Sequence, residues 1–446
     1  MLISEHLNYK KIFKLTIFPI IMMIFTSLYS IVDGIFVSNF SSDSAFAAVN
    51  LVMPFIMIVG SIGFMMGTGG TALVSKYLGE QNKEKANKAF SLIVYSTIII
   101  GIVVSIISFV LMKPIVVAMG NINKDTSKEM VDEAIIYGRL LISFNVLFML
   151  QNLFQSFFLV EERSKLGFLI TVGAGITNII LDALLIGVFK LGVVGAALAT
   201  ISGYLVASLS SILFFKFKKK GIIFLGKAEK NFKIIYRSAY NGLSEFVGNI
   251  SLSVVSIVYN IQLLRLYGEN GVSAYGIIMY VSFVFVAIFI GYSLGIAPAV
   301  GYNYGAQKTC ELKNILKKST IIMFILGLLM TVVSLLTAKP FSMIFSNGND
   351  DLLDLSIKAM KIYSFHFLIC GFSIFISSFF TALNNGTASA LISLLRTLVF
   401  QIIFVLAFPV LFGNTSIWWA CFASDLFALI ISVLFLLIYK KKYNYM

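Results

Sequence analysis

Long apolar stretches alternate with short polar breaks along the whole chain. Each stretch covers about 20 residues or more, the length that an α-helix needs to cross the hydrocarbon core of a bilayer. The pattern predicts twelve transmembrane helices joined by short loops. We expect them near residues 12–38, 46–76, 89–112, 134–159, 166–189, 192–215, 236–264, 272–302, 318–338, 357–382, 388–412 and 416–439.

The composition supports this interpretation and excludes a soluble protein. Of the 446 residues, 59% are hydrophobic and 12% are charged, whereas a soluble domain has about 45–50% apolar and about 25% charged residues. Such a chain cannot cover a water-facing surface. We therefore expect an all-α integral membrane protein without a large soluble domain.

The net charge of +14 is explained by the loops rather than by nucleic acid. With the N-terminus inside, Lys and Arg are about three times as frequent in the inner loops as in the outer ones, as the positive-inside rule requires. This predicts that both termini are cytoplasmic. The high content of Ile, Lys, Phe and Asn is typical of an AT-rich bacterial genome, so we expect the bacterial plasma (inner) membrane.

A basic segment from Lys216 to Arg237 divides the chain into similar halves. Gly69, Val74, Gly79 and Gln81 recur at one offset as Gly295, Val300, Gly305 and Gln307. Because each half has an even number of spans, both halves begin inside and form parallel repeats related by an axis along the membrane normal. We predict a six-helix lobe at 1–220, a cytoplasmic linker at 221–235 and a second six-helix lobe at 236–446.

Ionisable residues inside transmembrane helices are functional candidates, because a charge in lipid is costly. Asp33 and Asp182 lie at a similar depth near the outer ends of their helices, together with Asn178 and Thr200. Such oxygen ligands suit a hard cation such as Na⁺. Two carboxylates in a low-dielectric site must share a proton or hold a cation. The group predicts a cation-coupling site, and the alternative is that each carboxylate is structural.

Further polar residues accompany this group. Tyr29 lies one turn before Asp33, and Asn152 and Gln155 share a face of their helix, either as a supporting network or as polar bonds between helices. Glu245 lies in the inner half of the seventh helix, with His366 or Asn384 as its candidate partners. It either binds a substrate or a proton, or has a structural role.

Three more residues complete the intramembrane set. Arg396 and Asp425 lie about ten residues into neighbouring antiparallel helices, which predicts a structural ion pair. Pro19 removes a hydrogen bond from the first helix and permits a bend, so it is a candidate hinge.

These motifs, in this order, resemble the multidrug and toxic compound extrusion (MATE) transporters over essentially the whole chain. The resemblance rests on Ser30-Ile-Val-Asp33-Gly34, the turns Gly79-Glu-Gln81 and Gly305-Ala-Gln307, Asn178-Ile-Ile-Leu-Asp182, Gly192 to Thr200, and Gly242-Leu-Ser-Glu245. The last of these is similar to the bacterial multidrug-resistance branch.

The resemblance implies two six-helix lobes in a V and the efflux of organic cations or amphipathic drugs by antiport with Na⁺ or H⁺. It implies that Asp33, Asn178, Asp182 and Thr200 bind the coupling ion, which would be a metal site only for Na⁺. Another branch pairs the residue matching Glu245 with an acidic residue in helix 10, and this chain has none there.

Two other functions compete with drug efflux. A flippase or exporter of a lipid-linked or other amphipathic metabolite needs a basic cavity, whereas the intramembrane groups here are mostly acidic. A membrane enzyme needs clustered carboxylates or a His–Asp motif, and the sequence does not predict an enzyme. We expect no resident cofactor, small cationic or amphipathic substrates, contact with membrane lipid, no nucleic acid and a monomer.

Overall fold

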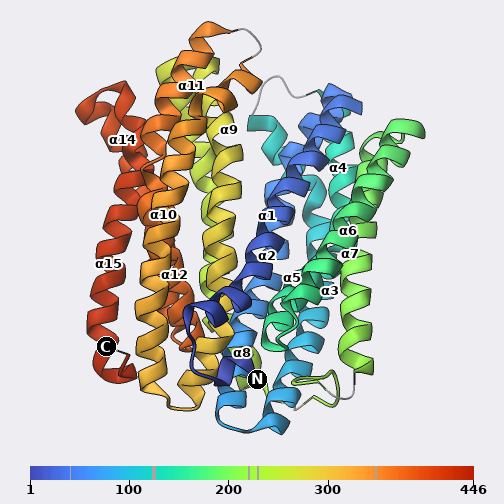
Figure 1. Ribbon diagram of the computed structural model, residues 1–446. Coiled ribbons are helices and arrows are strands. Elements are labelled where there is room, and N and C mark those ends of the chain that lie inside the picture. Colours follow the sequence, from blue (N-terminus) through green and yellow to red (C-terminus); the bar gives the residue numbers. More distant parts are fainter. Residues whose placement is uncertain (41, 123–126, 219–220, 229–230, 347–348, 446) are drawn as a thin grey trace. The chain divides into compact units, whose positions relative to one another are not determined.

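The computed structural model describes the chain except for residues 41, 123–126, 219–220, 229–230, 347–348 and 446. Within the described residues every regular element is a helix, and no strand occurs. Figure 1 shows these helices as long rods joined by short turns.

The membrane-spanning helices agree with the apolar pattern. Among the described residues nine helices are long and apolar enough to cross a membrane, and two bent pairs bring the number to 11. Helix α9 (Leu243–Gly305) has 63 residues, about three times the length that a bilayer core of about 30 Å requires. Gly268 interrupts it at φ 64° and ψ −151°, where the lack of a Cβ avoids a clash. Thus α9 holds two expected spans, and the predicted all-α, twelve-helix fold is confirmed.

Two expected helices are bent. The helix predicted at 134–159 consists of α4 (Lys128–Ser143) and α5 (Asn145–Val160), which meet at 51°. The helix predicted at 357–382 consists of α11 (Asp350–Tyr363) and α12 (His366–Ala382), which meet at 47°. At each joint a serine hydroxyl donates to the carbonyl four residues earlier, Ser143 to Arg139 over 2.7 Å and Ser364 to Met360 over 2.6 Å. Such bonds often bend helices.

The packing of the helices divides the chain into two compact units. The N-unit is Phe25–Gly242, and the C-unit combines Met1–Ile24 with Leu243–Met446. Helix α1 (Tyr9–Phe40) therefore contributes to both units. The lobe limits drawn from the repeat stay a prediction, and residues 229–230 of the linker at 221–235 lie outside the described residues.

The N-unit is organised around α2 (Asp43–Gly79), which packs against α5 through small residues. A Cβ at Gly63 would lie 2.4 Å from the Cα of Met149, and a Cβ at Gly67 would lie 3.0 Å from the Cα of Leu153. Small residues are typical where membrane helices approach closely. The other elements of this unit are α3 (Lys83–Ile122), α4, α6 (Ser164–Asp182), the π-helical turn η2 (Ala183–Val188), α7 (Gly192–Phe217) and α8 (Phe232–Asn241).

The start of the expected seventh helix belongs to the N-unit. The helix predicted at 236–264 is divided at Gly242, where α8 ends and α9 begins. A Cβ at Gly242 would lie 1.9 Å from the carbonyl oxygen of Met65, and one at Gly69 would lie 1.9 Å from that of Ser238. This close approach ties α8 to α2.

A buried carboxylate holds the segment that follows α7. Glu161, which is 4% exposed, accepts hydrogen bonds from Lys218 Nζ over 2.8 Å and from the backbone amides of Ile222 and Ile223 over 2.8 and 2.9 Å. Further along, the amides of Phe224 and Gly226 donate to side chains of α3. We call residues 221–226 the strap.

The C-unit includes the first turns of α1, which lie against α9. A Cβ at Gly291 would be 2.6 Å from the Cα of Ile20, and a Cβ at Gly295 would be 3.1 Å from the ring of Pro19. The candidate hinge is thus packed against two glycines. The remaining elements are the 3₁₀ turn η1 (Leu2–Ser4), α10 (Thr309–Phe345), α11, α12, α13 (Gly386–Leu394), the π-helical turn η3 (Leu395–Val399), α14 (Phe400–Phe412), the 3₁₀ turn η4 (Asn414–Trp419) and α15 (Ala420–Tyr443).

The residues before α1 are bound to α10. The amide of Leu7 donates to Glu311 over 2.8 Å, and its carbonyl accepts from Asn314 and Lys318 over 2.9 and 2.7 Å. We call these contacts the N-terminal clasp. Nearby, the hydrogen-bonded ammonium of Lys11 holds the pKa of the exposed Glu5 carboxyl below its usual value.

Large apolar side chains cover the outside of the helices. On α3 the exposed residues recur at helical spacing, as a lipid-facing stripe requires. They are Ile99, Ile102, Val103, Ile106 and Val110. The distribution agrees with helices that face lipid on one side and protein on the other.

Candidate functional site

Three of the four residues expected to bind a cation come together inside the N-unit. Asp33 lies on α1, whereas Asn178 and Asp182 lie one turn apart on α6. Asp33 interacts with both Asp182 and Asn178. Asp182 and Asn178 are 0% and 2% exposed, and Asp33 is half-buried. The two helices therefore bring two carboxyl groups and an amide to one place.

The polar atoms of this group are buried and lack hydrogen bonds of good geometry. Within the described residues, Asp33 Oδ1, both carboxyl oxygens of Asp182 and both amide atoms of Asn178 have no well-aligned hydrogen bond. Most buried polar atoms in folded proteins are paired, and two adjacent carboxylates cannot both carry an unbalanced charge. The arrangement suits a shared proton or a small cation with oxygen ligands.

Thr200 lies on the helix that packs against Asn178. A Cβ at Gly203 of α7 would be 3.4 Å from the Cβ of Asn178, and Thr200 is one turn earlier on the same face. The buried Thr200 hydroxyl donates to the carbonyl of Ala196 over 3.0 Å. Its oxygen keeps lone pairs that can accept a hydrogen bond or bind a cation.

Aromatic side chains surround the carboxyl groups. Tyr29 stacks on Phe25 with ring centroids 6.5 Å apart, and it interacts electrostatically with Asp33 and Asp182. Tyr137 and Tyr204 also interact with Asp33 and are nearly inaccessible. The sequence reasoning missed both, although Tyr204 follows Thr200 by four residues and so shares its face.

Asn152 and Gln155 make bonds at a distance from the carboxyl groups. Asn152 Nδ2 donates to the carbonyl of Phe148 over 3.0 Å, and Gln155 Nε2 donates to the hydroxyl of Thr171 over 3.1 Å. The first bond stays within α5 and the second joins α5 to α6. The Gln155 bond corresponds to the alternative of polar bonds between helices.

In the C-unit the charged residues form a second group. The expected ion pair is present, with Arg396 Nη1 4.0 Å from Asp425 Oδ1. Asp425 also contacts Nδ1 of His366, a partner that the sequence reasoning had considered only for Glu245. Glu245 instead interacts electrostatically with Arg396.

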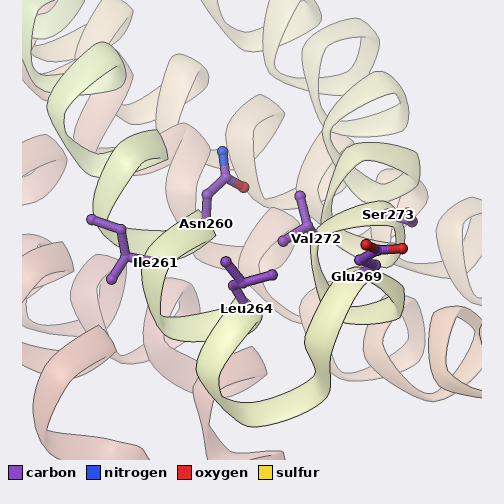
Figure 2. Close-up of a pocket in the computed structure, with 6 residues that line it drawn as sticks. All are labelled: Asn260, Ile261, Leu264, Glu269, Val272 and Ser273. Carbon is purple, nitrogen blue, oxygen red and sulfur yellow. The ribbon is translucent and has the colours of Figure 1, made fainter. Parts of the chain in front are cut away.

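A cavity lies beside the interruption of α9. It has a volume of about 530 Å³, and it is lined from both sides of Gly268 (Figure 2) by Asn260, Ile261, Leu264, Glu269, Val272 and Ser273. Ile261 and Leu264 in its lining are exposed, so this cavity is open to the surroundings of the protein. None of these six residues was singled out from the sequence, although the apolar pattern placed a break between the spans at 236–264 and 272–302.

Within the described residues no three His, Cys, Asp or Glu side chains gather to hold a metal ion. A Na⁺ ion in the N-unit would therefore rely on two carboxylates and neutral oxygens. The fold and the two polar groups define a multi-pass helical membrane protein with ionisable groups inside its helices, which is the organisation of a membrane transporter.

The comparison with known families agrees with this class. The family described as MatE matches residues 19–184 and 246–406, most of the chain. The chain therefore belongs to the MatE family of transporters, and the resemblance drawn from the sequence motifs is confirmed.

Curated relatives cover nearly the full chain. The multidrug export protein MepA of Staphylococcus haemolyticus is 26% identical over 424 residues, covering 93% of this chain and 91% of its own. MepA of Staphylococcus aureus strain MSSA476 is 24% identical over 416 residues, covering 92% and 89%.

Solved structures show the same fold. A MATE structure in complex with MaL6 aligns with a TM-score of 0.93 at 22% identity, covering 100% of this chain and 99% of its own. A MOP superfamily transporter from Pyrococcus furiosus aligns with a TM-score of 0.90 at 22% identity, covering 99% and 98%.

Proposed function

We propose that this protein exports organic cations or amphipathic drugs from a bacterial cell by antiport with Na⁺ or H⁺. One observation carries the proposal: Asp33, Asn178 and Asp182 bury unmatched oxygens in one place within a transporter fold. Relatives named as multidrug export proteins support the substrate class.

The residues have distinct roles in this proposal. Asp33 and Asp182 take up the coupling ion, while the amide oxygen of Asn178 and the hydroxyl oxygen of Thr200 complete a set of oxygen ligands. Neutralising the two carboxyl groups removes the charge that keeps α1 and α6 apart. A movement of α1, for which Pro19 supplies a bend, then couples ion entry to drug release by alternating access.

The proposal includes the setting of the protein. The basic inner loops favour a plasma membrane location with both termini in the cytoplasm. The exposed apolar stripes contact lipid directly, and the transporter works as a monomer without a resident cofactor.

Reconstituted proteoliposomes test this function. Ethidium is loaded as the fluorescent cation, and Na⁺ and pH gradients are imposed in separate experiments. We expect one gradient to drive ethidium transport, and Asp33→Asn to reduce that transport at least about tenfold because it removes an intramembrane carboxylate.

The matched control is Asp132→Asn, which makes the same change at an exposed position on α4. It is expected to transport as the wild type does. Transport by Asp33→Asn at the wild-type rate would disprove the proposed coupling site, and ethidium movement that ignores both gradients would disprove antiport.

A further inference from the structure

Four ionisable side chains of the C-unit gather where four elements meet. Glu245 lies at the start of α9, His366 at the start of α12, Arg396 in η3 and Asp425 in α15. Asp425 contacts His366 and lies 4.0 Å from Arg396, which interacts with Glu245. We call these four residues the C-unit cluster.

The C-unit cluster is buried and held by hydrogen bonds on both sides. Asp425 is 0% exposed and His366 is 5% exposed. The hydroxyl of Ser393 donates to the carbonyl of Ser244 over 2.9 Å, and that of Ser424 donates to the carbonyl of Arg396 over 2.8 Å. The backbones that carry Glu245, Arg396 and Asp425 are therefore linked to one another.

The polar atoms of the cluster are incompletely matched. In the part of the chain that the structure describes, Oδ1 of Asp425 and Nε of Arg396 have no hydrogen-bond partner, whereas Nδ1 of His366 lies against Oδ2 of Asp425. Arg396 also lies in a π-helical turn, a rare geometry that often marks functional positions. The other π-helical turn, η2, directly follows Asp182 of the N-unit.

The charges of the cluster do not balance without His366. Glu245 and Asp425 are acidic and Arg396 is basic, so when both carboxyl groups are ionised a neutral His366 leaves one net negative charge. An unbalanced charge is costly in a buried site within a membrane. The cluster is therefore balanced by one added positive charge.

The other titratable groups around His366 are phenols and thiols, which carry no charge near neutral pH. The Tyr363 ring lies 5.0 Å from the His366 ring, and Tyr259 OH lies 3.1 Å from Cys421 Sγ. The full set from α9, α11, α12 and α15 is Tyr259, Tyr275, Tyr363, Cys370 and Cys421. These groups leave the charge balance unchanged.

We propose that the C-unit cluster holds one added positive charge at a time: either a proton on His366 or the cationic group of an exported organic molecule beside Glu245. Glu245 is half-buried and is the acidic member that an organic cation approaches, whereas His366 and Asp425 are buried. Binding of the cation releases the His366 proton to water, and return of a proton weakens the bound cation. The substrate class rests on the proposed function.

Ethidium binding to purified, detergent-solubilised protein tests this exchange without transport. All proteins carry Asp33→Asn and Asp182→Asn, so that protons bound by the N-unit carboxyl groups do not contribute. Affinity is measured from about pH 5 to about pH 9, the range in which histidine usually titrates. We expect ethidium affinity to fall by up to about tenfold per unit of decreasing pH where His366 takes up its proton.

Two substitutions at His366 give opposite expected results. His366→Gln cannot take up the proton, so ethidium should bind with nearly the same affinity at each pH. His366→Lys supplies a fixed positive charge, so ethidium should bind weakly throughout. If His366 were purely structural, both variants would bind ethidium with the same dependence on pH. Thermal melting of each variant identifies loss of folding.

A pH dependence that His366→Gln leaves unchanged would overturn the proposal, as would ethidium binding by His366→Lys at wild-type strength. If the parent protein does not bind ethidium, the part of the proposal that places an organic cation beside Glu245 is wrong. Failure of the proposed antiport is detected separately, by the proteoliposome experiment, as ethidium transport that does not depend on the Na⁺ or pH gradient.

Discussion

Gln155 donates a hydrogen bond to the hydroxyl of Thr171, and this bond of 3.1 Å joins α5 to α6. The same hydroxyl donates to the carbonyl of Gly167 over 3.0 Å. A polar contact thus fixes α6, which carries Asn178 and Asp182, to α5 at a position about two turns before Asn178.

We expect this contact to stabilise the N-unit rather than bind the coupling ion. Gln155→Leu and Thr171→Val, alone and combined, should show a coupling of about 0.5–1.5 kcal/mol in the free energy of unfolding. Thermal or denaturant unfolding in detergent measures it. Loss of ion-driven transport in Gln155→Leu without loss of stability would assign Gln155 to the ion site instead.

Gly69 is a site where any side chain should disturb the N-unit. A Cβ there would lie 1.9 Å from the carbonyl oxygen of Ser238, so Gly69→Ala forces α8 away from α2 and should cost about 1–3 kcal/mol. The control is Gly173→Ala on α6, where a Cβ meets nothing within 4 Å. Equal melting temperatures of the two variants would show that α8 does not pack as described.

Glu161 should control the mobility of the strap. Glu161→Ala removes the acceptor of two backbone amides and of Lys218, and buried donors without partners cost about 1–3 kcal/mol. Hydrogen exchange should accelerate at Ile222 and Ile223. Glu129→Ala, an exposed change on α4, should leave that exchange unaltered. Slow exchange in both variants would show that Glu161 does not hold the strap.

Pro19 allows a direct test of the hinge in α1. Pro19→Ala restores a backbone donor and removes the ring that faces Gly295, so we expect slower transport with equal or greater thermal stability, because proline disfavours a helix interior by about 3 kcal/mol. Pro114→Ala on α3, another proline inside a helix, should transport normally. Unchanged transport by Pro19→Ala would eliminate the hinge.

Glu311 and Glu5 separate the N-terminal clasp from a simple surface charge. Glu311→Gln weakens a charge-assisted bond to the amide of Leu7, and hydrogen exchange at Leu7 should rise several-fold. Glu5→Gln loses only its exposed contact with Lys11 and should leave that amide protected. The reverse order of effects would mean that Glu311 does not hold the segment.

The sequence predicts the spans and the intramembrane carboxylates well because both depend on the cost of polar groups in lipid. That cost acts locally, so apolar length locates the helices, and Asp33 and Asp182 are identified by their position within them. It also explains why Asn178, one turn from Asp182, could be placed with the same group.

Features that depend on contacts between distant helices could not be predicted in this way. The bend before Asn145 has no proline or glycine, and the seventh helix is divided at Gly242, where Met65 of a distant helix lies against the backbone. His366 meets Asp425 from another helix, and no spacing along the chain encodes that pair. One of the two boundaries between the compact units falls inside α1 for the same reason.

The N-terminal clasp has a consequence for the order of events during synthesis. Leu7 and its partner Glu311 are 304 residues apart, and a ribosome adds about 5–20 residues per second. For about 15–60 s, the segment before α1 therefore lacks the acceptor of its Leu7 amide. Final anchoring of the earliest helix waits for the translation of α10, so a ribosome that stalls before that point would leave a nascent chain whose first segment is open to proteases.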